Sequence, residues 1–134
     1  MTYPIVELRQ YTLHPGTRDE LIDLFDREFV ESQEALGMQV LGQFRDLRRP
    51  DRFVWLRAFP DMETRAAALA SFYGGPVWAA HSDQANATMI DFDDVLLLRS
   101  LDSGFPLHAI FTRASSALCT ILSKPTDSGA SLES

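Results

Sequence analysis

Cysteine, lysine and long apolar runs are all scarce in this sequence, and each scarcity excludes a class of protein. The 134 residues contain one cysteine, Cys119, which excludes an internal disulfide and a zinc site built on several cysteines. We therefore expect a reduced, cytoplasmic setting. Residues Met1 to Pro4 lack the basic and apolar regions of a secretory leader. The most apolar run, residues 105–122, is interrupted by His108, Arg113 and several hydroxyl side chains, so we predict no membrane span.

Positive charge is also in deficit. Twelve basic residues against 19 acidic ones give a net charge of −7, which argues against non-specific binding of nucleic acid. All basic residues except Lys124 are arginines, and arginine suits planar hydrogen bonding to carboxylates. Nucleotide-binding, metalloprotease and nucleophile-elbow motifs are absent from the sequence, and no histidine lies at ligand spacing in the acidic segment 19–34. We therefore predict no metal site and no motif-bound cofactor.

Hydrophobic periodicity predicts one domain built from four strands and two helical regions. Alternating side chains mark strands at residues 5–13 and 40–47, and further strands are predicted at 53–59 and 92–99. Residues 53–59 are β-branched, aromatic and apolar, which indicates a strand buried on both faces. A capping box from Thr17 to Glu20 starts the first helix, whose apolar stripe is Leu21, Leu24, Phe25, Phe29 and Leu36.

The second helical region follows Pro60. Asp61 is the expected N-cap of a helix that runs to Tyr73. Gly74-Gly75-Pro76 should break this helix and restart it, and the restarted helix should reach Met89. We place the domain at residues 1–100, an apolar extension at 101–122 and a disordered tail at 123–134.

Three stretches give the sequence a resemblance to a known family. VELRQYTLHPGTRDEL, RFVWLRAFPDMETRAAALASFYGGPVW and the strand VLLLR resemble the NIPSNAP family over roughly residues 4 to 99, and FYGGPVW is the most specific block. The resemblance implies an α+β fold, a ferredoxin-like βαββαβ unit with a four-stranded antiparallel sheet of order 4-1-3-2. It also implies that two copies pair into a dimeric α+β barrel. It implies no single reaction.

The strands have one polar-aromatic face and one aliphatic face. We expect the aliphatic face to be covered by a second copy of the chain, because an exposed aliphatic sheet would be a large apolar patch. The polar-aromatic face should contain Arg9, Tyr11, Gln43, Arg45, Trp55 and Arg57, with Glu7 and Arg99 at its edge. The aliphatic face should contain Val6, Leu8, Val40, Phe44, Val54, Leu56, Leu96 and Leu98.

Several arginines on one sheet face need negatively charged partners. One interpretation is a network with acidic side chains of the partner subunit, which would fix the dimer. The other is a small anionic or phenolic ligand, bound by arginine and stacked on aromatic side chains. Substrate-binding candidates on the second interpretation are Arg9, Arg45, Trp55, Arg57, Tyr73, Trp78 and Asn86.

Two side chains are candidates for proton transfer. Histidine is the side chain whose ordinary pKa lies closest to neutral pH, and His81 lies three residues after Trp78, on the same helix face. Its alternative role is that of a surface or capping histidine. Tyr11 is the second catalytic candidate.

Two functions therefore stay open. One is a cofactor-independent enzyme or binder for a small, anionic or aromatic molecule. The other is a non-catalytic homo-oligomeric adaptor module, for which the absence of catalytic motifs and the apolar extension speak.

Overall fold

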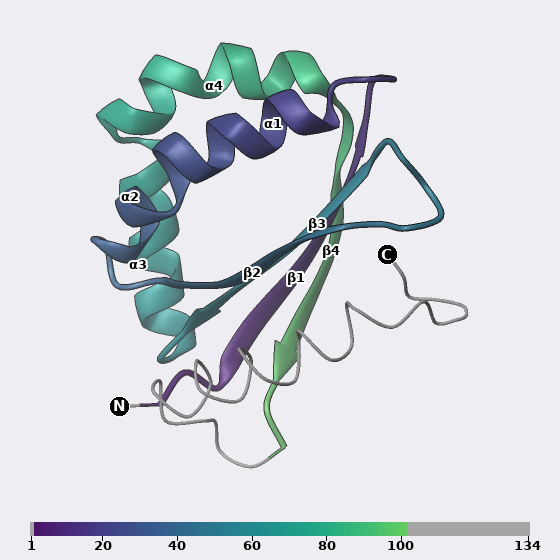
Figure 1. Ribbon diagram of the computed structural model, residues 1–134. Helices are drawn as coiled ribbons and strands as arrows, with labels where there is room; N and C mark the ends of the chain where they lie inside the picture. Colours follow the sequence, from purple (N-terminus) through teal and green to yellow (C-terminus); the bar gives the residue numbers. More distant parts are fainter. Residues whose placement is uncertain (1, 102–134) are drawn as a thin grey trace.

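The computed structural model describes residues 2–101, in which strands and helices follow one another largely as predicted (Figure 1). The extension expected at 101–122 and the tail expected at 123–134 lie, apart from Leu101, outside the described residues. The elements are β1 (Ile5–Leu13), α1 (Arg18–Leu24), a π-helical turn η1 (Phe25–Phe29), α2 (Glu31–Glu34), β2 (Gln39–Arg45), β3 (Arg52–Phe59), α3 (Met62–Tyr73), α4 (Pro76–Thr88) and β4 (Met89–Arg99).

The four strands form one antiparallel sheet in the order β2-β3-β1-β4. This is the predicted order 4-1-3-2 counted from the other edge. The described helices all cover the same face of the sheet (Figure 1). The ferredoxin-like α+β fold is therefore confirmed.

The hydrophobic core lies between the sheet and these helices. Two inward-facing side chains, Leu13 of β1 and Phe53 of β3, are at most 1% exposed. Phe25 packs edge-on against Phe53 and Trp55, with ring centroids 5.5 and 4.7 Å apart. Burial of each such aromatic side chain contributes roughly 1.5–3 kcal/mol to the stability of the fold.

The boundary between α3 and α4 forms as predicted. The Asp61 carboxylate accepts a 2.6 Å hydrogen bond from the backbone N–H of Thr64 and so caps α3. At Gly75 a Cβ atom would lie 2.6 Å from the carbonyl oxygen of Ser71, so the close approach of the two helices requires glycine. Pro76 then occupies the first turn of α4.

The first helical region departs from the prediction. Thr17 precedes α1, but its hydroxyl donates to the carbonyl oxygens of His14 and Thr88 instead of capping the helix. The capping box is therefore wrong. The predicted single helix is interrupted by the turn η1, whose wider winding rotates the residues that follow it. As a result Leu36 is 39% exposed and Gln33 is buried in its place.

A bulge in β2 corrects one predicted strand face. Val40 pairs with Arg57 while Gly42 pairs with Leu56, so β2 has one extra residue at this point. The extra residue reverses the alternation of side chains. Val40 therefore faces the helices and not the aliphatic face, whereas Gln43 and Phe44 keep their predicted faces opposite Trp55 and Val54.

Candidate functional site

A charge cluster centred on Glu7 occupies the face of the sheet under the helices. Glu7 Oε1 accepts hydrogen bonds from Arg9 Nη1 at 2.7 Å and from Arg57 Nε at 2.8 Å. Glu7 Oε2 accepts one from Arg65 Nε at 2.6 Å. The Glu7 side chain is 0% exposed, so it lies at the centre of the polar face and not at its edge as predicted. The carboxylate that pairs with these arginines belongs to the same chain.

The cluster carries more positive than negative charge, because three guanidinium groups share one carboxylate. Burial by itself would raise the pKa of Glu7, but Arg57 and Arg9 outweigh it and hold that pKa below its ordinary value. For Arg9, burial disfavours the charge, yet the electrostatic influence of Tyr11, Tyr73 and Glu7 raises the pKa. Both groups are therefore fully ionised at neutral pH.

Arg57 has a structural role in the charge cluster. Its guanidinium donates to Gln33 Oε1 at 2.6 Å and to Tyr73 Oη at 3.3 Å, in addition to Glu7. It also lies over the Trp55 ring, 4.7 Å from the centroid. The residue is 0% exposed, so Arg57 holds the cluster together beneath the surface that a ligand would touch.

Arg9, in contrast, lines a pocket. The pocket has a volume of about 290 Å³ and lies among β1, the end of α3, α4 and the start of β4. Five of the predicted site residues line it, namely Arg9, Tyr11, Tyr73, Trp78 and Asn86, together with Met89, Phe92 and Asp93. The Arg9 guanidinium is thus both paired with a carboxylate of its own chain and accessible from the pocket.

Irregular pairing of β4 completes the pocket wall. Gln10 pairs with Asp94 and Thr12 with Asp91, so β4 has an extra residue opposite Tyr11. A regular strand points consecutive side chains to opposite faces, whereas a bulge changes that alternation. Phe92 and Asp93, although adjacent in the sequence, both line the pocket.

The Tyr11 hydroxyl is the best placed proton donor in the pocket. Its oxygen accepts a 3.1 Å hydrogen bond from Arg9 Nε. Burial, the largest influence, raises the pKa of Tyr11 above its ordinary value, and Tyr73 adds to this, although Arg9 and Arg57 act in the opposite direction. Tyr11 is therefore a neutral phenol at physiological pH, and its O–H can donate to a ligand.

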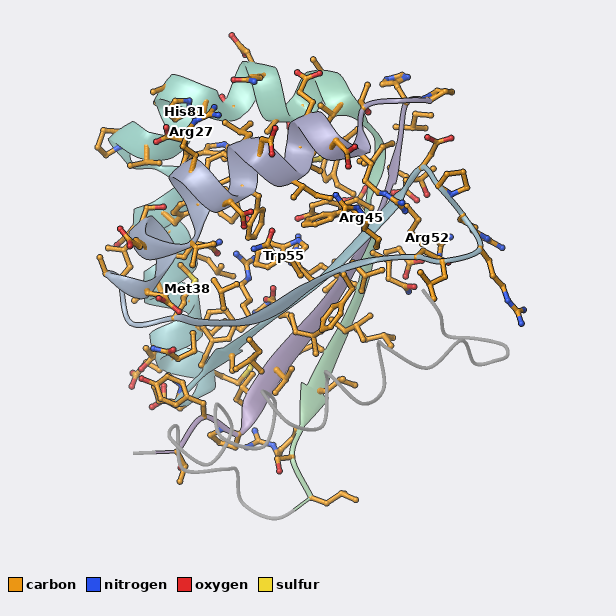
Figure 2. All side chains as sticks on the ribbon, in the orientation of Figure 1. Arg27, Met38, Arg45, Arg52, Trp55 and His81 are labelled. Atoms are coloured by element: carbon orange, nitrogen blue, oxygen red, sulfur yellow. The ribbon has the colours of Figure 1, made fainter. Side chains whose placement is uncertain are left out.

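A smaller inner cavity lies next to this pocket. It has a volume of about 30 Å³ and shares Tyr11, Tyr73, Trp78 and Met89 with the pocket wall. Its other lining residues include Trp55, which is 2% exposed. Trp55 is therefore placed behind the pocket, between the sheet and the helices (Figure 2).

The two remaining predicted residues lie elsewhere. Arg45 donates to Asp19 Oδ1 at 2.8 Å and lines a separate groove between α1 and β2. His81 Nε2 lies 3.3 Å from Glu28 Oε1, and Figure 2 shows His81 in the helical layer. Both His81 and Trp78 contact the ring of Phe29, as their spacing predicts, but His81 does not line the pocket.

Sequence reasoning missed part of the site. The sequence pattern predicts Met89 in a helix and Phe92 and Asp93 in a regular strand, because a bulge leaves no reliable pattern in the sequence. Gln33, whose amide binds Arg57 and donates to the carbonyl oxygen of Phe29 at 2.7 Å, was also missed. The only available signal was a lone polar residue on the predicted apolar side of a helix.

Fold and site together define a ferredoxin-like α+β protein with a polar-aromatic pocket between its sheet and its helices. The model of the NIPSNAP family matches residues 6–102, and the chain belongs to this family. No curated protein matches the sequence.

Solved structures share the fold at low sequence identity. A NIPSNAP-like domain protein from Burkholderia xenovorans is 24% identical, with a TM-score of 0.68 over 79% of this chain and 92% of its own. A NIPSNAP family protein from Agrobacterium tumefaciens is 18% identical, with a TM-score of 0.68 over 76% of this chain and 90% of its own. A candidate antibiotic biosynthesis monooxygenase from Chloroflexus aurantiacus is 18% identical, with a TM-score of 0.54 over 72% of this chain and 92% of its own.

Residues 2–101 contain neither a membrane-spanning helix nor a group of metal-ligating side chains. No helix in this range is long and apolar enough to cross a membrane. No three side chains of His, Cys, Asp or Glu in the same range are grouped so that they could hold a metal ion.

Proposed function

We propose that this NIPSNAP family protein binds a small anionic molecule with an aromatic part in the pocket at Arg9. The observation that carries the proposal is the position of Arg9, which lines the pocket while belonging to a cluster of three arginines and one carboxylate. An anion at Arg9 would offset the excess charge. Asp93 lies on the exposed rim and removes only part of that excess.

Aromatic side chains make the other walls. Tyr11, Tyr73 and Trp78 all line the pocket, and the Tyr73 and Trp78 rings meet edge to face at 5.2 Å. Such walls favour a planar, apolar ligand body. Tyr11 would donate a hydrogen bond to the ligand and would supply the proton if the ligand is transformed. This chemistry needs no cofactor of the kind that binds through a recognisable sequence motif.

A thermal-shift screen tests the proposal. Benzoate, salicylate and cinnamate are suitable probes, because each has one carboxylate and one aromatic ring. A ligand that binds only the folded state raises the stability of that state by about 2.7 kcal/mol at a hundredfold excess over Kd. In Arg9→Gln we expect binding to weaken by roughly tenfold or more, since a charge-assisted hydrogen bond is lost. Arg45→Gln, which changes an exposed arginine outside the pocket, should bind as the native protein does. Equal binding by both variants, or no binding by any probe, would contradict the proposal.

We further propose that a second copy of the chain covers the aliphatic face of the sheet. Val6, Leu8, Val54 and Leu56 share this face with Leu96 and Leu98, according to the strand register. Leu96 and Leu98 are 50% and 42% exposed. Two-fold pairing would bury the same patch of both copies, which is the arrangement that the family resemblance implies. A purely structural homo-oligomeric module, without a ligand, would need only this face.

A further inference from the structure

Trp55 contains a buried polar group that the described part of the chain leaves unpaired. The indole ring is fixed by Phe25 at 4.7 Å and by the Arg57 guanidinium at 4.7 Å, and the residue is 2% exposed. Within residues 2–101, no group accepts a hydrogen bond from Trp55 Nε1. Most buried polar groups are hydrogen-bonded, because an unpaired one loses its contact with water without compensation.

The inner cavity is where an acceptor for this N–H can be placed. Trp55 lines the cavity, whose volume of about 30 Å³ is sufficient for one water-sized group. Tyr11, Tyr73, Trp78 and Met89 line both the cavity and the pocket. A ligand in the pocket is therefore adjacent to the cavity.

The other walls determine the charge of the acceptor. Leu21, Phe25, Phe29 and Phe72 are apolar, and a charged group placed among them would be strongly disfavoured. Besides Tyr11, Tyr73 and Trp78, which the cavity shares with the pocket, the polar lining residue is Gln33. Both ends of its amide are already occupied by Arg57 and the backbone. The cavity therefore suits a neutral oxygen that accepts a hydrogen bond from Trp55 Nε1.

We infer that Trp55 Nε1 is a specificity-determining donor, and that the ligand carries a neutral carbonyl or hydroxyl oxygen that enters the inner cavity while its anionic group binds Arg9. This inference rests on the proposed function and narrows it to bifunctional molecules such as keto- or hydroxy-substituted aromatic acids. An aromatic carboxylate without a further oxygen-containing substituent would fill the pocket but leave the indole N–H unpaired.

Nuclear magnetic resonance on the native protein tests this directly, because the chain contains two tryptophans and each gives one indole N–H signal. A Trp78→Phe variant assigns the two signals. The probes are 3-acetylbenzoate and 3-isopropenylbenzoate, which have similar shape and charge and differ in the ketone oxygen. We expect the ketone to move the Trp55 indole proton signal downfield, and the hydrocarbon analogue to leave its position nearly unchanged.

Affinities give the second readout. The ketone should bind about three- to tenfold more tightly than the hydrocarbon, which is the contribution of one neutral hydrogen bond. In Trp55→Phe this preference should disappear, and where that variant does not fold, the signals of the native protein decide alone. If the ketone binds and shifts only the Trp78 signal, the inference is wrong while the pocket proposal stands. If neither probe binds, both the pocket proposal and the inference about Trp55 are contradicted.

Discussion

Arg9 donates a 3.1 Å hydrogen bond through Nε to the hydroxyl of Tyr11, two residues further along the same strand. The same guanidinium donates to Glu7 at 2.7 Å. A single strand face thus connects a buried carboxylate, an accessible cation and a neutral phenol in sequence. The consequences of this arrangement can be measured separately for binding and for stability.

Removal of the Tyr11 hydroxyl should weaken ligand binding. In Tyr11→Phe the ring stays, but the donor to the ligand and the acceptor for Arg9 are both lost. We expect the affinity for salicylate, measured by isothermal titration calorimetry, to fall by about three- to tenfold. Tyr3→Phe is the matched control, since Tyr3 is buried but does not line the pocket. Unchanged affinity in Tyr11→Phe would exclude the phenol from the site.

Removal of the Glu7 charge should destabilise the protein strongly. Glu7→Gln would leave three arginines around a neutral amide in a buried position, and loss of one partner of a buried ion pair costs about 3–5 kcal/mol. Urea denaturation measures the free energy of unfolding. Glu31→Gln, at an exposed position of α2, should change it by less than about 0.5 kcal/mol. A Glu7→Gln protein as stable as the native one would show that the cluster contributes little.

Acid should remove the same stabilisation. The pKa of Glu7 in the folded protein lies below its ordinary value of 4.5, so the unfolded chain takes up its proton first as the pH falls. The contribution is complete above about pH 4.5 and is lost as the pH drops through the lower, folded-state pKa. Stability measured between pH 7 and pH 3 should therefore fall less steeply in Glu7→Gln than in the native protein. Parallel curves would contradict the ionised state assigned to Glu7.

A charge on the aliphatic face should separate the proposed dimer. Leu8 lies at the centre of that face, paired with Leu56 on one side and Leu96 on the other. Light scattering should give about twice the chain mass of 15.1 kDa for the native protein and the single-chain mass for Leu8→Asp. The exposed Leu47→Asp, in the connection after β2, is the control. A native particle of one chain mass would contradict the pairing.

His81 should prove dispensable for binding. Its ring faces Glu28 at 3.3 Å and does not line the pocket. We expect His81→Gln to bind salicylate with native affinity between pH 5.5 and pH 8. A pH-dependent loss of affinity confined to this variant would restore the role that the sequence suggested for the histidine.

Local sequence patterns were sufficient for the order of strands and helices along the chain, and the family resemblance supplied the order of strands in the sheet. Period-two strands, the Asp61 cap and the Gly74-Gly75-Pro76 break each act over a few residues, and each predicted its element correctly. Errors arose where one residue is inserted into a regular element. The turn Phe25–Phe29 and the bulge before Gly42 each shift the residues that follow, and these insertions depend on tertiary packing.

The site was predictable in its residue types and not in its grouping. Arginine and aromatic side chains on one strand face pointed to Arg9 and Tyr11, and helical spacing added Trp78. Neither pattern could show that Glu7 would be central, since one carboxylate serves three arginines only after strands and helix are packed. For His81, three-residue spacing predicts the helix face that it shares with Trp78 but not what lies opposite that face, and its ring lies by Glu28 outside the pocket.

The irregular stretch of β4 has a kinetic consequence. Phe92 and Asp93 form one wall of the pocket where the ladder between β1 and β4 is interrupted, and β4 is an edge strand within the described sheet. Amide hydrogens in this stretch of β4 should exchange with solvent faster than those of β3. Transient fraying of the stretch would let a ligand enter and leave the pocket without disturbing the hydrophobic core. The residence time of a bound molecule would then be set by the rate at which this part of β4 opens, and not by how deeply the molecule is buried.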